Sequence, residues 1–427
     1  MTCRATIIIP SFNGRSHLET CLRSLFAGED LNGGSEVLVV DNGSTDGTRE
    51  WLATTHPRAR LVPLAENGGF TGAIAAGCDA ADPDSDFLVF LNNDTRVESG
   101  WLVALVEALA TAPPETATVS GRILSWDGER IDFYRGAMAF DGHAFQLDFH
   151  RPLAAVAAAG EAAEVPFPCG GNMAVRREAW DSLGGFDDDY FAYTEDVDFG
   201  WRSWLAGYDH RYEPGATVYH RSGATGLTLG VYRRGYLYEK NAFMTAYKNL
   251  DEERFRALMP AILWTLIHRA LTLITDSNMD GAKLGGYPLP PYARPGSAAP
   301  PAEGLGARLR RHGLRGAARR ALLKLARRLG EGGSASERVI LHDARTLEHL
   351  RAVHFLVHHL DDLAAKRERV QTLRRRGDDE YFARFPLLLV PTYPGDDDLF
   401  ASRGFEEWLP RELALLRRSL DEIGDLR

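Results

Sequence analysis

Two neighbouring carboxylates, Glu195 and Asp196, stand where an apolar helical pattern begins, and an imidazole, His220, follows the next apolar run. Such side chains can accept a proton or bind a metal ion. Carboxylates are also common at the positive end of a helix, where the helix dipole stabilises them by ~0.3–1 kcal/mol. For Asp198 we favour a structural role, an ion pair with Arg202 four residues further on. A lone histidine is more often structural than a ligand, so residue type alone leaves the role of His220 open.

Regular elements must position these groups, and the first 125 residues show short β-branched runs that alternate with helical patterns. This alternation is typical of βαβ units around a parallel sheet whose faces are covered by helices. One helix is indicated by Leu18, Cys21, Leu22, Leu25 and Phe26, whose spacing places them on a single buried face. The strands that we predict span residues 5–9, 36–40, 60–63, 87–91, 118–123 and 216–219.

A polar segment follows each of the first four predicted strands. In an open α/β sheet the carboxyl ends of the strands line one crevice, in which ligands bind. Taken singly, each segment is explained as turn chemistry, because Asn, Asp, Gly and Ser are the usual loop residues. Taken together, the segments favour a ligand site. They are Pro10-Ser11-Phe12-Asn13, Asp41-Asn42-Gly43-Ser44, Glu66-Asn67-Gly68-Gly69 and Asn92-Asn93-Asp94.

As an ordered set, the motifs of this chain resemble those of bacterial family-2 inverting glycosyltransferases of GT-A fold, in particular rhamnosyl- and galactofuranosyltransferase-like members. The resemblance covers residues 4–230. It implies an α/β fold, the Rossmann-like mixed sheet of GT-A enzymes flanked by helices, with a helical C-terminal region after it. The motifs that carry the resemblance are Ile7-Ile8-Ile9-Pro10-Ser11-Phe12-Asn13, Val39-Val40-Asp41-Asn42-Gly43-Ser44-Thr45-Asp46-Gly47, Asn67-Gly68-Gly69-Phe70, Leu91-Asn92-Asn93-Asp94, Gly184-Gly185-Phe186-Asp187 and Glu195-Asp196-Val197-Asp198.

The resemblance implies a role for each candidate site residue. It makes Asp196 the base that takes the proton of the acceptor hydroxyl, with Glu195 beside it. It makes Asp94 and His220 ligands of a divalent metal ion, Mn or Mg. The Asp-x-Asp motif of the family is represented by Asn92-Asn93-Asp94, so the first carboxylate is missing. Donor binding is expected from Pro10, Phe12, Asn13, Asp41, Asn42, Glu66, Asn67, Gly68, Gly69, Asn92 and Asn93.

Three of these assignments have a structural alternative. Asp41, expected to hold the base and ribose of the donor, can equally close an Asx turn at the end of a strand. Trp180, Trp201 and Trp204 could stack on a sugar, but we favour the core, where aromatic side chains in a helix-rich region usually lie. A glycine-rich segment that lets the acceptor approach the backbone can also be a simple hairpin turn. The residues of this acceptor-binding segment are Gly170, Gly171 and Asn172.

Composition excludes several classes of protein. A net charge of -10 argues against a nucleic-acid-binding protein, which would present clustered Lys and Arg. Four cysteines without C-x-x-C spacing support neither a disulfide framework nor a zinc site and fit a reducing cytoplasm. The first apolar run starts at once, which leaves no room for a signal peptide. The apolar stretch 260–275 is interrupted by His268 and Arg269, so we predict no membrane-spanning helix.

We expect four regions: a GT-A catalytic domain at 1–230, a helical extension at 231–284, a Pro/Gly-rich linker at 285–304 and a helical C-terminal region at 305–427. Residues 305–330 hold nine Arg or Lys and no Asp or Glu. This basic amphipathic pattern fits either peripheral contact with the inner face of the cell membrane or the solvated face of a packed helix. We also consider that the chain forms a homo-oligomer.

The expected function is transfer of a sugar from a UDP-, dTDP- or GDP-linked donor to a glycan or lipid-linked saccharide in cell-envelope polysaccharide synthesis. A sugar nucleotidyltransferase is one alternative. It should carry a glycine-rich loop with Arg or Lys directly after the first strand, where this chain has Pro10-Ser11-Phe12-Asn13. A catalytically silent nucleotide- or glycan-binding module is the second, kept open by the missing carboxylate of the Asp-x-Asp motif.

Overall fold

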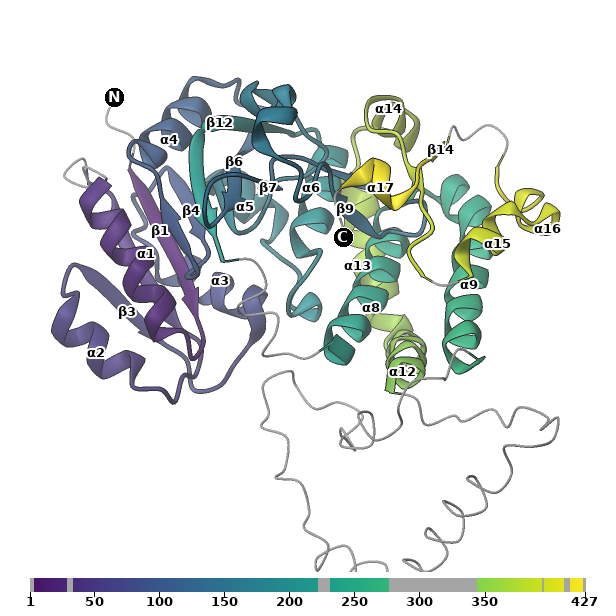
Figure 1. The fold of residues 1–427 in the computed structure, drawn as a ribbon, viewed down its shortest axis with the longest axis horizontal. Coiled ribbons are helices and arrows are strands. Elements are labelled where there is room, and N and C mark those ends of the chain that lie inside the picture. The colour runs from purple at the N-terminus through teal and green to yellow at the C-terminus, as the bar shows by residue number, and fades with distance from the viewer. Residues whose placement is uncertain are drawn as a thin grey trace, which may run out of the picture.

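One large sheet with helices on both faces dominates the part of the chain that the structure, a computed structural model, describes (Figure 1). The described residues are 4–28, 34–221, 231–275, 344–393, 395–410 and 415–424, so the predicted linker 285–304 and basic segment 305–330 lie outside them. The strands of this sheet are β1 (Ala5–Ser11), β2 (Glu36–Asp41), β3 (Ala59–Pro63), β4 (Phe87–Leu91), β5 (Thr95–Val97), β6 (Thr116–Ser125), β7 (Ile131–Phe133), β10 (Ala163–Glu164), β11 (Asn172–Arg176) and β12 (Asp209–His220).

The order of strands explains why the sheet is mixed. β1 pairs in parallel with β2 and β4, and β2 pairs in parallel with β3. β11 then runs antiparallel between β4 and β6, and β12 pairs in parallel with β6. The six predicted strands are all present, and the α/β fold with a mixed sheet flanked by helices is confirmed.

Helices cover the two faces of the sheet because successive side chains of each strand point to opposite faces. Ile7 and Ile9 of β1 pack into the core that includes α1, α2 and α4, whereas Ile8 packs into the core that includes α3 and α5. The predicted apolar face of α1 is buried, with Leu18 and Leu22 fully enclosed. These helices and the one that follows them are α1 (Arg15–Gly28), α2 (Thr48–Thr55), α3 (Gly69–Ala80), α4 (Trp101–Thr111), α5 (Arg177–Leu183) and α6 (Glu195–Leu205).

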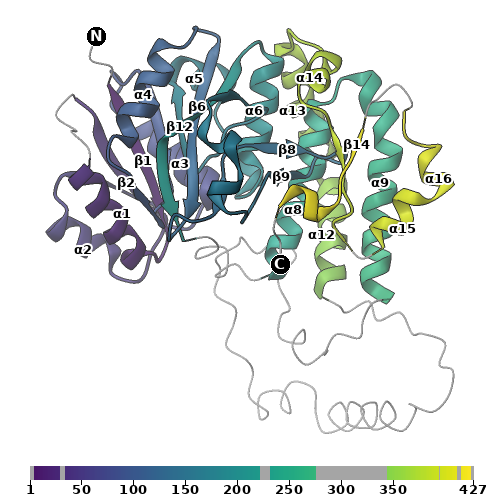
Figure 2. The same cartoon turned by 45° about the horizontal axis from the view of Figure 1, so that its top comes forward.

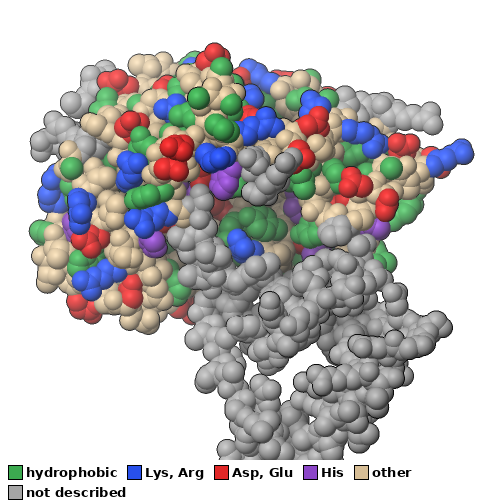
Figure 3. Space-filling view, viewed as in Figure 1, with side chains coloured by type: hydrophobic (Ala, Val, Ile, Leu, Met, Phe, Trp, Pro, Cys, Tyr) green, Lys and Arg blue, Asp and Glu red, His purple; other side chains and the backbone are tan. Residues whose placement is uncertain are grey.

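A second group of helices lies beside one end of the sheet in both ribbon views (Figures 1 and 2). Between the sheet and these helices the face seen in Figure 3 is hollowed, and hydrophobic side chains gather in the hollow. The helices are α8 (Val231–Asn249), α9 (Glu252–Thr275), α12 (Ala344–His358), α13 (Leu360–Leu373), α14 (Asp378–Arg384), α15 (Asp396–Ala401), α16 (Arg403–Glu406) and α17 (Leu420–Ile423). Short strands accompany them: β8 (Gly136–Met138) pairs with β9 (Ala144–Gln146), and β13 (Leu388–Leu389) with β14 (Leu416–Arg417).

Aromatic contacts join the two groups of helices. The ring of Tyr381 on α14 stacks on Trp201 of α6 at 5.7 Å between centroids, and its hydroxyl donates to the carbonyl of Pro166 at 3.0 Å. Trp180, Trp201 and Trp204 are buried, so their assignment to the core is confirmed. The predicted ion pair of α6 also forms: Arg202 Nε donates to Asp198 Oδ2 at 3.0 Å.

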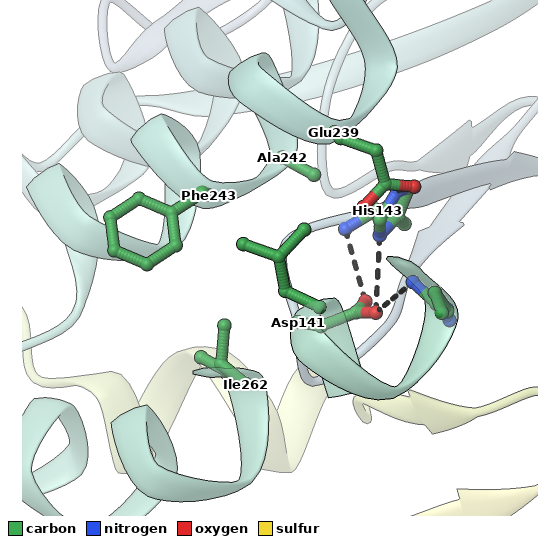
Figure 4. A pocket seen from close by; sticks show the side chains of 8 residues that line it. Asp141, His143, Glu239, Ala242, Phe243 and Ile262 are labelled. Atoms are coloured by element: carbon green, nitrogen blue, oxygen red, sulfur yellow. Dashed lines mark hydrogen bonds and ion pairs between the residues drawn. The ribbon is translucent and has the colours of Figure 1, made fainter. Parts of the chain in front are cut away.

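A buried cluster of charges joins the chain near β8 and β9 to α8 and α9 (Figure 4). The imidazole of His143 lies between two carboxylates, with Nδ1 3.1 Å from Asp141 and Nε2 3.3 Å from Glu239 on α8. Arg269 of α9 forms ion pairs at 3.0 Å with Asp141 and with Asp396 of α15. The cluster lines a small cavity whose other walls are apolar. Buried charges of this kind are tolerated because each one has an opposite partner.

Within the described ranges, no helix is long and apolar enough to cross a membrane. Residues 260–275, the apolar stretch considered in the sequence, fall in α9. That helix contains Pro260, and its buried Arg269 belongs to the charge cluster.

Candidate active site

The polar segments that follow β1, β2 and β4 meet at one edge of the sheet. Asn93 Nδ2 donates to Ser11 Oγ at 3.0 Å, which ties the end of β4 to the end of β1. The side-chain oxygen of Asn13 accepts from the backbone N–H of Thr45 at 2.8 Å, which ties β1 to the loop after β2. Pro10 and Phe12 are half-buried beside these contacts. The structure therefore brings these predicted segments together, as expected for parallel strands.

Asn42 fixes the loop that contains Glu66, Asn67, Gly68 and Gly69. Its Nδ2 donates to Asn67 Oδ1 at 3.0 Å and to the carbonyl of Gly69 at 2.8 Å, and its Oδ1 accepts from the N–H of Gly68 at 2.9 Å. Gly69 has φ +80°, and a Cβ there would lie 2.3 Å from the carbonyl oxygen of Phe191. The loop is thus held between β2 and the segment that precedes α6, while Glu66 stays exposed at its surface.

Asp41 is fully buried at the end of β2. Its Oδ2 pairs with Arg49 of α2 and accepts from the N–H of Ser44 at 3.3 Å, so the Asx-type turn that we considered forms. Its Oδ1 is buried and has no hydrogen-bond partner in the part of the chain that the structure describes. A buried carboxylate oxygen without a partner costs ~1–3 kcal/mol. The turn and a ligand contact are therefore compatible, because each uses a different oxygen.

Asp94 and His220, the two predicted metal ligands, lie in contact. Nε2 of His220 is 3.2 Å from Asp94 Oδ1, and Nδ1 is 3.0 Å from Oδ2 of Asp132 on β7. Burial alone would lower the pKa of His220, but the hydrogen bonds to Asp132 and Asp94 raise it to about 10. Antiparallel pairing of β12 with β5 sets this geometry, since it places His220 opposite Thr95.

The side chains present would fit a divalent metal ion only if a bound ligand supplied further oxygen atoms to it. Within the described residues, no three His, Cys, Asp or Glu side chains form a group that could hold a metal by themselves. The two nitrogens of an imidazole point in different directions, so Asp132 cannot join Asp94 on the same ion. Asp94 and His220 are left as two groups that could bind an ion, and small divalent ions commonly take their other ligands from substrate phosphates and water. Asn93 is engaged with Ser11, and Asn92 is half-buried beside Gly171.

Glu195 and Asp196 form the entrance to α6. The carboxylate of Asp196 accepts from the N–H of Gly170 at 2.9 Å and of Val197 at 2.8 Å. Burial raises the pKa of Asp196, although these backbone donors oppose the shift. Burial, and then the adjacent charge of Asp196, raise the pKa of Glu195 well above its ordinary value. Carboxyl groups whose pKa is raised toward neutrality are suited to accept a proton.

The three residues assigned to the acceptor occupy different places. A Cβ at Gly170 would lie 3.5 Å from Glu195 Oε1, and one at Gly171 would lie 2.7 Å from Asn92 Nδ2, so both glycines sit between the two halves of the site. Asn172 is instead fully buried at the start of β11. Its Oδ1 accepts from Trp101 Nε1 at 2.7 Å, and its Nδ2 donates to the carbonyls of Arg122 and Ala216. Its side chain therefore supports the core and faces away from the crevice.

Sequence reasoning missed two features of the site. Asp132, which holds His220, lies in a three-residue strand that belongs to no recognisable motif. Tyr238 of α8 stacks on Tyr193, two residues before Glu195, with ring centroids 4.7 Å apart. The sequence carries no spacing signal for either contact, because each joins segments that are distant along the chain.

Comparison with known proteins identifies the family. Residues 6–184 match the model of glycosyl transferase family 2. The chain is 32% identical over 250 residues to an N-acetylglucosaminyl-diphospho-decaprenol L-rhamnosyltransferase of Mycobacterium tuberculosis, a match that covers 53% of this chain and 79% of that relative. The chain belongs to glycosyl transferase family 2. The predicted resemblance to rhamnosyltransferase-like members of this family is thereby confirmed.

Two other known proteins match this chain over a smaller share of their own length. It is 29% identical over 224 residues to a pre-mycofactocin glycosyltransferase of Mycobacterium tuberculosis, which covers 50% of this chain and 42% of the relative. Among solved structures, GalNAc-T7 with UDP, GalNAc and Mn²⁺ superposes with a TM-score of 0.48 at 18% identity, over 61% of this chain and 51% of that one.

Proposed function

We propose that this chain is an inverting, metal-assisted glycosyltransferase that moves a sugar from a nucleotide-sugar donor to a glycan or lipid-linked saccharide. One observation carries the proposal. In a chain of family 2, Glu195 and Asp196 at the start of α6 and the Asp94–His220 pair at the ends of β4 and β12 are connected through Gly170 and Gly171, which contact Asp196 and Asn92. The first pair suits proton transfer from a hydroxyl, and the second suits a diphosphate with its metal ion.

The chemical step needs a base on the acceptor side. The oxygen of the acceptor hydroxyl forms a bond to the anomeric carbon, while the bond from that carbon to the diphosphate oxygen breaks on the opposite face. The hydroxyl proton goes to Asp196, and the leaving diphosphate keeps the electron pair. A positioned base contributes ~10²–10⁴ in rate. Glu195 is more deeply buried, its own pKa is raised further by the adjacent charge of Asp196, and it is the second candidate for the base.

Asp94 and His220 would hold the metal ion at the leaving group. When bound, a divalent metal neutralises the negative charge that develops on the diphosphate. Asp132 would keep the imidazole of His220 oriented through its 3.0 Å contact. The family's first motif carboxylate is replaced by Asn92, so this site depends on Asp94 and His220 alone among the motif residues. Whether Mn or Mg serves is decided by titration with each ion.

The donor nucleoside is proposed to lie against the ends of β1 and β2. Oδ1 of Asp41, which has no hydrogen-bond partner among the described residues, can accept a hydrogen bond from a base or a ribose hydroxyl. The backbone of the loop held by Asn42 and the half-buried Phe12 would complete the walls. UDP, dTDP and GDP donors all fit this description, so a screen must identify the nucleotide.

The acceptor is proposed to approach past Gly170 and Gly171, where Asp196 lies. The relative from Mycobacterium tuberculosis is named for a sugar linked through diphosphate to a polyprenol. By analogy we propose a lipid-linked or glycan acceptor in cell-envelope polysaccharide synthesis, made at the cytoplasmic side of the membrane. Peripheral membrane contact through residues 305–330 would serve such an acceptor.

A donor screen tests the proposal. Purified protein is incubated with UDP-, dTDP- and GDP-sugars, with and without Mn²⁺ or Mg²⁺, and nucleoside diphosphate release is measured. We expect release from at least one donor, dependent on the metal and lowered by Asp196→Asn. Release of pyrophosphate from a nucleoside triphosphate and a sugar phosphate would instead identify a nucleotidyltransferase. Tight nucleotide binding without turnover would identify a silent binding module.

A further inference from the structure

Two stacked tyrosines lie directly beside the candidate catalytic carboxylates. Tyr193 precedes Glu195 by two residues, and Tyr238 comes from α8, beyond the residues that match the family model. The two rings are 4.7 Å apart between centroids, with an angle of 26° between their planes. Tyr193 covers one face of the Tyr238 ring, yet Tyr238 stays 37% exposed. An aromatic surface is thus open to solvent at the carboxylates.

Helix α8 holds the segment that carries Tyr193. Asn241 Nδ2 donates to the carbonyls of Tyr190, Ala192 and Tyr193 at 3.1, 2.9 and 2.7 Å. Lys240, one residue earlier, donates through Nζ to the carbonyl of Asp189. The helix therefore fixes the entire approach to α6 by its own polar side chains.

The backbone of this segment is strained. Phe191, Tyr193 and Thr194 have φ of +63°, +70° and +61°, in the left-handed region that side chains other than glycine rarely adopt. Each such residue costs on the order of 1–3 kcal/mol, and it persists only where surrounding contacts determine the conformation. The hydrogen bonds from Asn241 hold this segment in its conformation. Strained backbone of this kind is concentrated at functional sites, where it holds side chains in orientations that a relaxed loop would not give them.

Glu195, two residues after Tyr193, carries an unsatisfied carboxylate oxygen. Glu195 is 6% exposed, and its Oε2 is buried without a hydrogen-bond partner in the described part of the chain. A hydroxyl donor would satisfy it, and saccharides present several hydroxyls around each ring. The charges of Glu195 and Asp196 reach Tyr238: burial raises the pKa of its hydroxyl, Arg234 opposes the shift, and the two carboxylates add to it.

We propose that Tyr193 and Tyr238 form an aromatic wall on which the pyranose ring bearing the attacking hydroxyl stacks, so that α8 helps to select the acceptor. This inference rests on the proposed function. It adds the residues that would contact the acceptor sugar. The face of an aromatic ring is negative and attracts the C–H groups of a sugar face. Stacking would leave the ring hydroxyls free to reach Glu195 and Asp196. Tyr238 would then be a specificity-determining residue supplied by helix α8.

The experiment separates acceptor binding from donor turnover. Wild type, Tyr238→Ala and Tyr238→Phe are compared, with Trp408→Ala as a matched control. Trp408 is 49% exposed, and its ring centroid lies 4.7 Å from that of Trp264. It follows α16, a helix that lies on the far side of the helical part from the sheet (Figure 1). The probes are methyl and octyl glycosides of common hexopyranoses and of N-acetylglucosamine, used with the nucleotide sugar from which wild type releases nucleoside diphosphate.

We expect Tyr238→Ala to raise the KM for methyl and octyl glycosides alike by ~10-fold, the size of a lost aromatic contact. Tyr238→Phe, which keeps the ring, and Trp408→Ala should stay within about twofold of wild type. Nucleoside diphosphate release to water is measured in parallel for every variant, so that a change in donor turnover is distinguished from a change in acceptor binding. A loss confined to octyl glycosides would overturn the proposal in favour of a lipid contact. An unchanged KM in Tyr238→Ala would overturn the proposal. So would a wild-type protein that hydrolyses the donor but transfers sugar to no methyl glycoside. If wild type releases no nucleoside diphosphate, the proposed function itself has failed.

Discussion

Asp132 holds the imidazole of His220 from the side opposite Asp94, with Oδ2 3.0 Å from Nδ1. The two residues are 88 positions apart in the chain and meet because β7 and β12 both pair with β6. A carboxylate behind a metal-binding histidine fixes the orientation and the tautomer of the ring. The contact therefore connects a residue without any sequence motif to the proposed metal site.

Substitution of Asp132 by Asn should weaken metal binding without unfolding the protein. We expect the affinity for Mn²⁺ in the presence of UDP or GDP to fall by ~10–100-fold, as is usual when the outer partner of a ligating histidine is removed. Electron paramagnetic resonance of free Mn²⁺ measures this affinity without any turnover. Asp127→Asn, on the same hairpin but exposed, is the control and should bind Mn²⁺ as wild type does. Equal affinity in Asp132→Asn would remove Asp132 from the site.

Asp94 should dominate metal-dependent donor binding. Because it is the one carboxylate of the motif Asn92-Asn93-Asp94, Asp94→Ala should abolish the increase in nucleoside diphosphate affinity that Mn²⁺ produces, and His220→Ala should cause a smaller loss. Calorimetric titration with and without Mn²⁺ gives both values. Binding of nucleoside diphosphate without metal should persist in both variants, which shows that the fold is intact. A full Mn²⁺ effect in Asp94→Ala would place the metal elsewhere.

Asp196 and Glu195 can be separated by conservative amides. If Asp196 takes the acceptor proton, Asp196→Asn should lower kcat by ~10²-fold or more while donor affinity stays within a few-fold of wild type. The variant keeps an oxygen that can accept from the N–H of Gly170, so the local fold should survive. Steady-state kinetics with saturating donor measures the effect. A kcat within a few-fold of wild type would instead favour Glu195, and Glu195→Gln would then show the large loss.

The buried cluster around His143 should make stability depend on pH. Burial would lower the pKa of His143, but Asp141 and Glu239 raise it to about 10, above the ordinary 6.5. Since the folded-state pKa is the higher one, the charge of His143 stabilises the fold fully below pH 6.5, and this contribution is lost as the pH rises through 10.

Removal of one partner from a buried ionic cluster costs ~3–5 kcal/mol. We therefore expect His143→Gln to lower the free energy of unfolding by this amount at pH 6, and by progressively less as the pH approaches 10. Denaturant unfolding at several pH values provides the measurement, with His17→Gln on α1 as a control outside the cluster. A difference between wild type and His143→Gln that does not change with pH would mean that the imidazole is neutral in the folded protein.

The sheet and the clustered polar segments could be predicted because their signals are local. Apolar runs of five residues mark strands such as β4, and the rule that parallel strands share a carboxyl edge then brings Asn13, Asp41 and Asp94 toward one crevice. Asp196 and His220 entered through the family resemblance, since neither has a decisive spacing of its own.

The missed contacts depend on tertiary packing. Tyr238 belongs to a helix whose sequence shows no feature that indicates a neighbour, and its contact with Tyr193 exists because Asn241 binds that segment. Asn172 shows the opposite case. Its polarity and its glycine neighbours suggested the acceptor site, but Trp101, 71 positions away, takes its side chain into the core. The sequence pattern does not indicate whether such a polar side chain will contact a ligand or another residue in the core.

The most direct test of the account is the configuration of the product. With the donor and acceptor found in the screens, proton NMR of the anomeric signal in the new glycoside reports both that a glycosidic bond has formed and on which face. The account predicts a metal-dependent glycoside whose anomeric configuration is opposite to that of the donor sugar, and its loss in Asp196→Asn. A product with retained configuration, or one formed at the wild-type rate by Asp196→Asn, would contradict it.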